Sequence, residues 1–398
     1  MFKAASASSM NPSAEPAAAE CAAQIEDAGL TRPDFVIVHC NCALSLRDIG
    51  RVLRERWQGV RLHAATSCLG GMTDKQVAMS PDAGLALLAF SDPAGEYGIA
   101  SGGMSAGSRG SGRELAQRAL EDAGRAGEIP ALVLVCATPG EEEEFLAGVQ
   151  SVVGSGTPVI GGSAADNDIS GSWRILHGSE ALSDAAVVSV LFPSVAVSTA
   201  FESAYAPSEH RGVVSAAKGR RILEIDGAPA ADVYERWSEG AVRRPASGAT
   251  NILMQSALMP LGRVAGFLVD MPIYNLSHPE TISADGSLSL FTRIDEGDEV
   301  VFMKGTSTTL VNRASNVLRS ASRFAELDPA QVSAMVMYYC GGCMLQVRDR
   351  LDDIQTSLTR TAPGVPMVVG FTFGEQGCLS KGSAMHGNLM ISSIVFGR

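Results

Sequence analysis

The stretch VSAMVMYYCGGCMLQVRDRL, residues 332–351, carries the pattern that organises the chain. An apolar run ends at Cys340, two glycines follow, and apolar residues then recur at steps of three and four from Met344 to Leu358. This change of period predicts a buried strand, a tight turn and an amphipathic helix. A second apolar run, VPMVVGFTFGEQG (365–377), completes a strand–helix–strand unit that ends in a glycine-rich loop.

Two earlier stretches repeat this unit. The first begins with an apolar run from Phe35 that ends at Cys40, continues with a helix capped by Ser45, and closes with VRLHAATSCLGG (60–71). The second consists of ALVLVCATPG, EEEEFLAGVQSVVG and TPVIGGSAADN, residues 131–167 with a short gap. A single cysteine ends the first strand of each unit. Buried cysteine packs as a compact apolar residue, so the structural interpretation of these three thiols is the simpler one.

We therefore predict an α/β fold of two related domains, with mixed β-sheets flanked by helices and with internal strand–helix–strand repeats. One arrangement of these elements is a layered α/β/β/α sandwich. The predicted boundaries are a disordered, Ala/Ser/Pro-rich tail over 1–30, a first domain over 31–205 and a second over 212–398, where ESAYAPSEHRG (202–212) turns polar.

Composition excludes several classes of protein. A net charge of −12 and the lack of a basic stripe argue against nucleic-acid binding. No run approaches the 18 or so apolar residues of a membrane-spanning helix, so no membrane partner is expected. Eight cysteines in 398 residues are too few for a disulfide scaffold and favour a reducing, cytoplasmic location.

Five motifs occur in an order that resembles the FIST family. They are GGSAADN (161–167), LEIDGAPAADVY (223–234), SADGSLSLFTRIDEGDEVVFMKG (283–305), VVGFTFGEQG (368–377) and MHGNLMISSIV (385–395). The resemblance runs from about Phe35 to Phe396. It implies that the two domains are FIST N and FIST C domains, and that the chain is a sensory module for small ligands.

The sequence departs from the family pattern at two places. The loop AATSCLGGMTD (64–74) lacks the glutamate that family members usually carry there. The first arginine after the thiol turn is Arg348, whereas the family commonly has one near the position of Met344. These departures imply a ligand that differs from that of typical members.

The glycine-rich loops after Ile160 and Val369 are the predicted ligand site, because glycine lets the backbone approach a bound molecule closely. Asp166, Asn167 and Glu375 would then bind the ammonium group or hydroxyls of a small, amino-acid-like metabolite. In the alternative interpretation the glycines only make turns and the two carboxylates only cap them. The candidate ligand-binding residues are Gly162, Ser163, Asp166, Asn167, Tyr274, Cys340, Gly370, Phe373, Gly374, Glu375, His386 and Asn388.

Two alternatives concern thiols and metals. Cys340 and Cys343 form a C-x-x-C at a helix start, which in a thiol-dependent enzyme or redox protein has a lowered thiol pKa. The second alternative is a gas or redox sensor that binds haem or a metal ion, because some FIST proteins are described as haem-binding sensors. The candidate metal or haem ligands are His39, Cys40, Cys42, Cys340, Cys343, Cys378 and His278, with His386 as a second histidine to test.

No hydrolase, nucleotide-binding or output-domain motif is present, so catalysis is the minority interpretation. Signalling would then pass to a partner protein in trans. For haem-binding relatives that partner is a histidine kinase or a cyclic-dinucleotide enzyme. The sequence therefore predicts a cytoplasmic small-ligand sensor.

Overall fold

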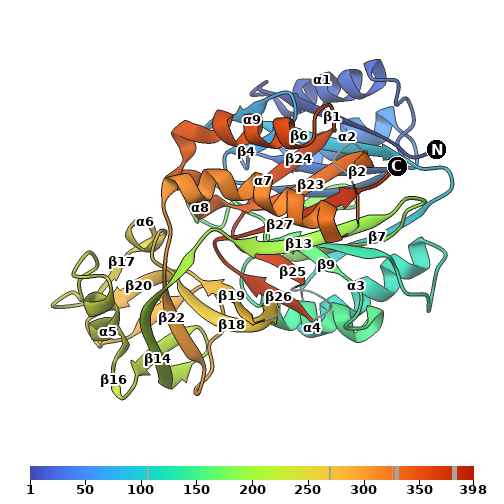
Figure 1. The fold of residues 1–398 in the computed structure, drawn as a ribbon. Helices are drawn as coiled ribbons and strands as arrows, with labels where there is room; N and C mark the ends of the chain where they lie inside the picture. The colour runs from blue at the N-terminus through green and yellow to red at the C-terminus, as the bar shows by residue number, and fades with distance from the viewer. Residues whose placement is uncertain (105–106, 269, 325, 328–330, 379–382) are drawn as a thin grey trace.

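The computed structural model describes residues 1–398 except 105–106, 269, 325, 328–330 and 379–382. Its body consists of three units of the same plan: an outer strand, a helix, a strand, a helix or helices, a strand, a hairpin and a closing strand (Figure 1). The first unit comprises β1 (Lys3–Ser9), α1 (Ala14–Asp27), β2 (Phe35–Cys40), α2 (Leu46–Arg56), β3 (Arg61–Thr66), β4 (Gly70–Thr73), β5 (Val77–Met79) and β6 (Leu85–Ser91).

The other two units follow directly along the chain. The second comprises β7 (Glu96–Gly103), α3 (Ser108–Asp122), β8 (Leu132–Ala137), α4 (Glu142–Val153), β9 (Val159–Gly162), β10 (Ile175–His177), β11 (Glu180–Leu182) and β12 (Ala185–Phe192). The third comprises β13 (Val197–Ser203), α7 (Ser307–Phe324), β23 (Ala334–Cys340), α8 (Gly341–Gln346), a 3₁₀ turn (Arg348–Arg350), α9 (Leu351–Thr361), β24 (Met367–Thr372), β25 (Glu375–Cys378), β26 (Ala384–Gly387) and β27 (Met390–Phe396).

Each unit forms the larger part of one six-stranded sheet, and the three sheets have the same strand order. They are β1-β6-β2-β3-β10-β11, β7-β12-β8-β9-β25-β26 and β13-β27-β23-β24-β4-β5. In each sheet the central pair is parallel, as in β2–β3, because a helix crosses over between its two strands. The last two strands of every sheet are the hairpin of another unit. The three units thus exchange hairpins in a closed ring.

The inner faces of the three sheets share one apolar core. Phe35 and Phe90 come from the first sheet, Leu134 from the second, and Val336 and Phe396 from the third. The helices cover the outer faces, with α1 and α2 on the first sheet, α3 and α4 on the second, and α7 and α9 on the third. The α/β class with helix-flanked mixed sheets is therefore confirmed, and so are the three strand–helix–strand repeats.

The prediction of a disordered tail over residues 1–30 is wrong. All seven residues of β1 pair antiparallel with β6, and α1 buries Ala17, Ala18, Cys21 and Ile25 against its neighbours. Small Ala and Ser side chains let this strand and helix pack closely, although the same composition resembles a low-complexity segment. Phe2 also stacks on Phe396 with ring centroids 5.6 Å apart, which brings the two ends of the chain together.

A separate lobe is inserted into the third unit between β13 and α7, at lower left in Figure 1. Its elements are β14 (Ala206–Lys218), β15 (Arg221–Ile225), β16 (Ala228–Pro229), α5 (Ala230–Trp237), β17 (Ala249–Asn251), α6 (Leu253–Ser256), β18 (Leu261–Leu268), β19 (Met271–Ser277), β20 (Pro279–Ser283), β21 (Leu288–Leu290) and β22 (Glu299–Lys304). They form a nine-stranded antiparallel sheet with its own apolar core. The polar stretch 202–212 marks the start of this lobe. Among the described residues, no helix is long and apolar enough to cross a membrane.

Candidate functional site

The loops that follow β3, β9 and β24 meet and hydrogen-bond to one another. The amide of Cys68 donates to the Phe371 carbonyl at 2.9 Å, and the amide of Ala165 donates to the Thr66 carbonyl at 3.1 Å. The amide of Ser163 donates to the Gly374 carbonyl at 2.8 Å, which closes the ring. The structure therefore brings together the two glycine-rich loops in which the sequence predicts a ligand site.

Glycine is required at two positions where these loops approach other side chains. A Cβ on Gly162 would lie 2.4 Å from the methyl carbon of Thr372. A Cβ on Gly374 would lie 2.3 Å from the imidazole of His386, and the φ of Gly374 is +133°, a conformation that side chains other than glycine rarely adopt. The two glycines thus allow side chains to approach the backbone closely, and the side chain at Gly374 is that of His386, one of the candidate residues.

A buried polar network lies beside Ser163, where the second unit, the β25–β26 hairpin and the inserted lobe meet. The Ser163 hydroxyl donates to Glu142 Oε1 at 2.9 Å and accepts from Gln376 Nε2 at 3.1 Å. Gln376 Nε2 also lies 3.2 Å from His386 Nδ1, and Asn275 of the lobe donates to the His386 carbonyl at 2.9 Å. We call Glu142, Ser163, Asn275, Gln376 and His386 the junction cluster.

The junction cluster contains a charged carboxylate that the lobe compensates. Burial alone would raise the pKa of Glu142, but His386 and Arg220 outweigh it, so the pKa lies below its usual value. Arg220 reaches from the lobe to Glu142 Oε2 at 2.8 Å and to Glu143 Oε2 at 2.7 Å. These two carboxylates also hold the pKa of Arg220 above its usual value in spite of burial. Glu142 is therefore ionised, although only 2% of its surface is exposed.

Three polar atoms of the junction cluster have no hydrogen-bond partner in the described chain. They are Asn275 Oδ1, Gln376 Oε1 and His386 Nε2, and their residues are 2%, 2% and 3% exposed. The nearest charged group to His386 Nε2 is Glu142 Oε1 at 3.8 Å, which is beyond hydrogen-bond distance. Buried polar groups are nearly always satisfied, so these three unpartnered atoms require an explanation.

Glu375 and Asp166 are satisfied inside the chain. Glu375 accepts hydrogen bonds from the Thr372 hydroxyl at 2.9 Å and the Met390 amide at 3.0 Å. Burial, with Cys340 nearby, raises the pKa of Glu375 well above its usual value. Asp166 accepts from the amides of Ile169 and Ser172 at 2.6 and 2.7 Å and so caps its own loop. For these two residues the geometry favours the capping interpretation.

The remaining ligand candidates lie around this centre. Asn167 links two units, because its side chain accepts from the Leu69 amide at 2.8 Å and donates to Asn41 at 3.2 Å. Asn388 Oδ1 accepts from the His278 amide at 3.3 Å. Tyr274 precedes Asn275 on β19 and is half-buried.

Three further candidates sit on the third sheet and the loop after it. Phe373 packs edge-on against Trp173, and Gly370 lies against the His39 ring. Cys340 ends β23, and its thiol hydrogen-bonds to Cys343, which contacts the Tyr205 hydroxyl at 3.4 Å. Burial raises the pKa of Cys340, so a lowered-pKa redox thiol does not fit it.

The candidate metal and haem ligands do not converge. His39 and Cys40 point to opposite faces of β2, Cys42 lies in the next loop, and Cys378 contacts the Val159 amide through its sulfur at 3.4 Å. Within the described ranges, no three His, Cys, Asp or Glu side chains are placed to hold a metal ion. His278 Nε2 already lies 3.0 Å from the Leu253 carbonyl, so it does not fit an axial haem ligand facing open space.

Sequence reasoning missed four residues of this region. Glu142 belongs to the EEEE run, which reads as an acidic helix start, and Arg220 belongs to KGRR, which is too short for a basic patch. Gln376 lies inside the quoted loop FGEQG, next to Glu375, and Asn275 follows Tyr274. The sequence offered one clue to Gln376 and Asn275: each is a polar residue next to a predicted site residue.

Comparison with known proteins places the chain in a family. A FIST N domain model matches residues 34–228, and a FIST C domain model matches residues 230–378. No curated protein matches the chain. Among solved structures, a cyanuric acid hydrolase from A. caulinodans is 10% identical over 100% of both chains, with a TM-score of 0.40. PurLQS from Thermotoga maritima is 8% identical over 76% of this chain and 72% of that one, with a TM-score of 0.22. Because the two domain models together cover most of the sequence, the chain belongs to the FIST family.

Proposed function

We propose that this protein is a small-ligand sensor that binds a polar, amino-acid-like metabolite at the junction cluster and signals to a partner protein. Membership of the FIST family supports the sensory role. The observation that carries the proposal is the group of three unpartnered polar atoms on Asn275, Gln376 and His386, all buried at the contact between body and lobe.

The chemistry of the open atoms selects the class of ligand. Asn275 Oδ1 and Gln376 Oε1 accept hydrogen bonds, so they favour a ligand that donates, such as an ammonium or hydroxyl group. The ionised Glu142 adds negative charge, and Arg220 adds positive charge beside it. A zwitterionic molecule, which carries both signs, matches this mixture better than a simple cation or anion.

The position of the site also suits a sensor. Asn275 and Arg220 belong to the inserted lobe, whereas Glu142, Gln376 and His386 belong to the body. A ligand that bonds to both sides changes the free energy of contact between lobe and body. That contact is a route by which binding is passed to a partner in trans, with a kinase or a cyclic-dinucleotide enzyme as the partner class implied by the family.

The test is a thermal-shift screen of the purified full chain with amino acids and related polar metabolites, followed by calorimetry on any hit. We expect a saturable rise in Tm that Gln376→Met and Asn275→Leu abolish. Gln24→Met is the matched control, because Gln24 is an amide that bonds to Ser8 far from the junction. A hit that binds both junction variants as tightly as the wild type, or no hit in the screen, would contradict the proposal.

A further inference from the structure

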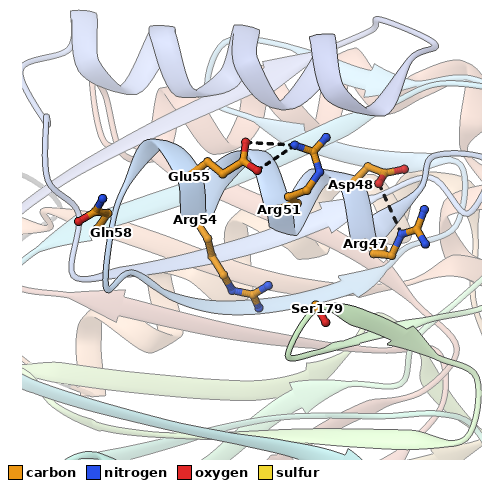
Figure 2. Close-up of a pocket in the computed structure, with 7 residues that line it drawn as sticks. All are labelled: Arg47, Asp48, Arg51, Arg54, Glu55, Gln58 and Ser179. Atoms are coloured by element: carbon orange, nitrogen blue, oxygen red, sulfur yellow. Dashed lines mark hydrogen bonds and ion pairs between the residues drawn. The ribbon is translucent and has the colours of Figure 1, made fainter.

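A hollow lies on the outer face of the first unit, between α2 and the turn that joins β10 and β11. It has a volume of about 670 Å³ and is lined by polar side chains of α2, by Gln58 after the helix and by Ser179 of the turn (Figure 2). This volume is in the range of small-molecule sites. The hollow is separate from the junction cluster, which involves other elements.

The helix that lines the hollow is positively charged in an acidic protein. Residues 46–56 contain four arginines and two acidic residues, which gives +2, whereas the whole chain carries −12. Three of the four arginines have carboxylate partners. Arg47 lies 3.5 Å from Asp48, Arg51 lies 3.0 Å from Glu55, and Arg56 bonds to Glu26 at 2.7 Å.

Arg54 is the exception. No carboxylate lies within 4 Å of its guanidinium in the part of the chain that the structure describes, although the side chain is half-buried. Figure 2 shows Arg54 extending from α2 away from the Arg51–Glu55 pair, on the side where Ser179 lies. Burial lowers the pKa of Arg54, as expected for a partly desolvated charge without a counter-charge.

We propose that Arg54 is the centre of a second binding site, which takes a small anion with a carboxylate or phosphate group. The planar guanidinium presents paired N–H donors that match the oxygens of either group. Ser179 lines the same hollow and supplies a hydroxyl, and the charged lining consists of Arg47, Arg51 and Arg54 against Asp48 and Glu55, a net charge of +1. This site is independent of the proposed metabolite site and gives the sensor a second input.

The experiment measures binding of inorganic phosphate and of succinate to the full chain by calorimetry, with chloride at matched ionic strength as the reference. We expect saturable binding of at least one anion, weakened roughly tenfold or more by Arg54→Gln, since a charge-assisted bidentate pair is lost. Whichever anion binds more tightly assigns the site to phosphate or carboxylate. Arg56→Gln is the matched control, because it removes an arginine of the same helix whose partner lies outside the hollow.

Stability gives a second readout that does not depend on the anion. In chloride, Arg54→Gln should fold with a Tm equal to or above that of the wild type, because the substitution removes a half-buried charge without breaking an ion pair. Arg56→Gln should not raise the Tm. The proposal is overturned if neither anion saturates, if Arg54→Gln and Arg56→Gln bind alike, or if Arg54→Gln loses stability in chloride.

Discussion

Two clusters of buried polar side chains with unpartnered atoms differ in charge and in position. The junction cluster contains the ionised Glu142 and lies where lobe and body meet. The other group, which we call the inner histidine cluster, consists of His39, His63, Ser189 and Tyr338 on strands of the three sheets. Its open atoms are His39 Nε2, His63 Nε2 and the Tyr338 hydroxyl.

The inner histidine cluster is held by contacts among neutral groups. His63 Nδ1 lies 2.9 Å from the Ser189 hydroxyl, and His39 packs edge-on against Tyr338 with ring centroids 5.5 Å apart. Burial lowers the pKa of His39 to about 4 and that of His63 to about 3, so both rings are neutral at neutral pH. Buried atoms without a hydrogen-bond partner therefore do not by themselves indicate a ligand site. The junction cluster differs in that it lies at the contact between lobe and body and contains the ionised Glu142, whose charge Arg220 compensates.

The largest expected effect is acid destabilisation through the inner histidine cluster. The unfolded histidines have a pKa near 6.5, whereas the folded values are about 4 and about 3. Between these limits the unfolded chain binds protons that the native rings do not, so stability falls as pH is lowered below 6.5. Each histidine contributes up to about 1.4 kcal/mol per pH unit, or about 4 kcal/mol for both between pH 7 and 5. Urea unfolding across this range measures it.

A variant separates this effect from the titration of carboxylates. Burial also lowers the pKa of His278 to about 4, so His63→Gln removes one of three such histidines, and the slope of unfolding free energy against pH should fall by about 1.4 kcal/mol per unit below pH 6. Imidazole proton resonances of the wild type should show both rings neutral at pH 5. An unchanged slope in His63→Gln would mean that this ring is protonated in the folded state and has a partner.

The second effect is on the charges of the junction cluster. Arg220→Met leaves the buried Glu142 carboxylate without its closest cation and should lower the unfolding free energy by about 3 kcal/mol. Arg293→Met is the control, because Arg293 is 55% exposed and pairs with Glu144 at 3.6 Å, where a loss of under about 1 kcal/mol is expected. Denaturant unfolding at pH 7 compares them. Adding Glu142→Gln to Arg220→Met should recover part of the loss, and equal losses in the two arginine variants would contradict an ionised Glu142.

The third effect is on packing around His39. A Cβ on Gly370 would lie 2.6–2.7 Å from three atoms of the His39 ring, which is buried. Gly370→Ala should therefore cost about 2 kcal/mol by overpacking. Gly156→Ala, at a position with no atom within 4 Å of the added carbon, should change stability by less than about 0.5 kcal/mol. Similar Tm values for the two variants would show that the His39 ring moves freely, and that the inner cluster is not rigid.

Local patterns in the sequence predict the repeated unit but not how the units are joined. Apolar runs that end at Cys40, Cys136 and Cys340 give three strands, and the helical periodicity after them gives the helices. The exchange of hairpins is different, because β4–β5 pairs with a strand almost 300 residues away. Such pairing depends on tertiary packing and leaves no periodic signal. β1 and α1 resemble a disordered tail for another reason, which is their Ala- and Ser-rich composition.

The candidate site was predictable to the extent that glycine-rich loops mark close approach. Gly162, Ser163, Gly374 and His386 are found together, as expected from loops that end neighbouring strands. Asn275 and Arg220 come from the inserted lobe, and their contacts with the body depend on how that lobe docks. The raised pKa of Glu375 likewise follows from burial, which the sequence does not display.

The smallest effect tests whether the inner histidine cluster is dry. The Tyr338 hydroxyl is buried without a partner, so Tyr338→Phe should leave stability unchanged or raise it by up to about 1 kcal/mol. Tyr234→Phe is the matched control, because the Tyr234 hydroxyl donates to the Met259 carbonyl at 2.7 Å and its loss should cost about 1 kcal/mol. Thermal unfolding of the two variants compares them. Equal losses would mean that an ordered water molecule hydrogen-bonds to the Tyr338 hydroxyl. Water would then also explain the unpartnered atoms at the junction cluster, unless a ligand displaces it.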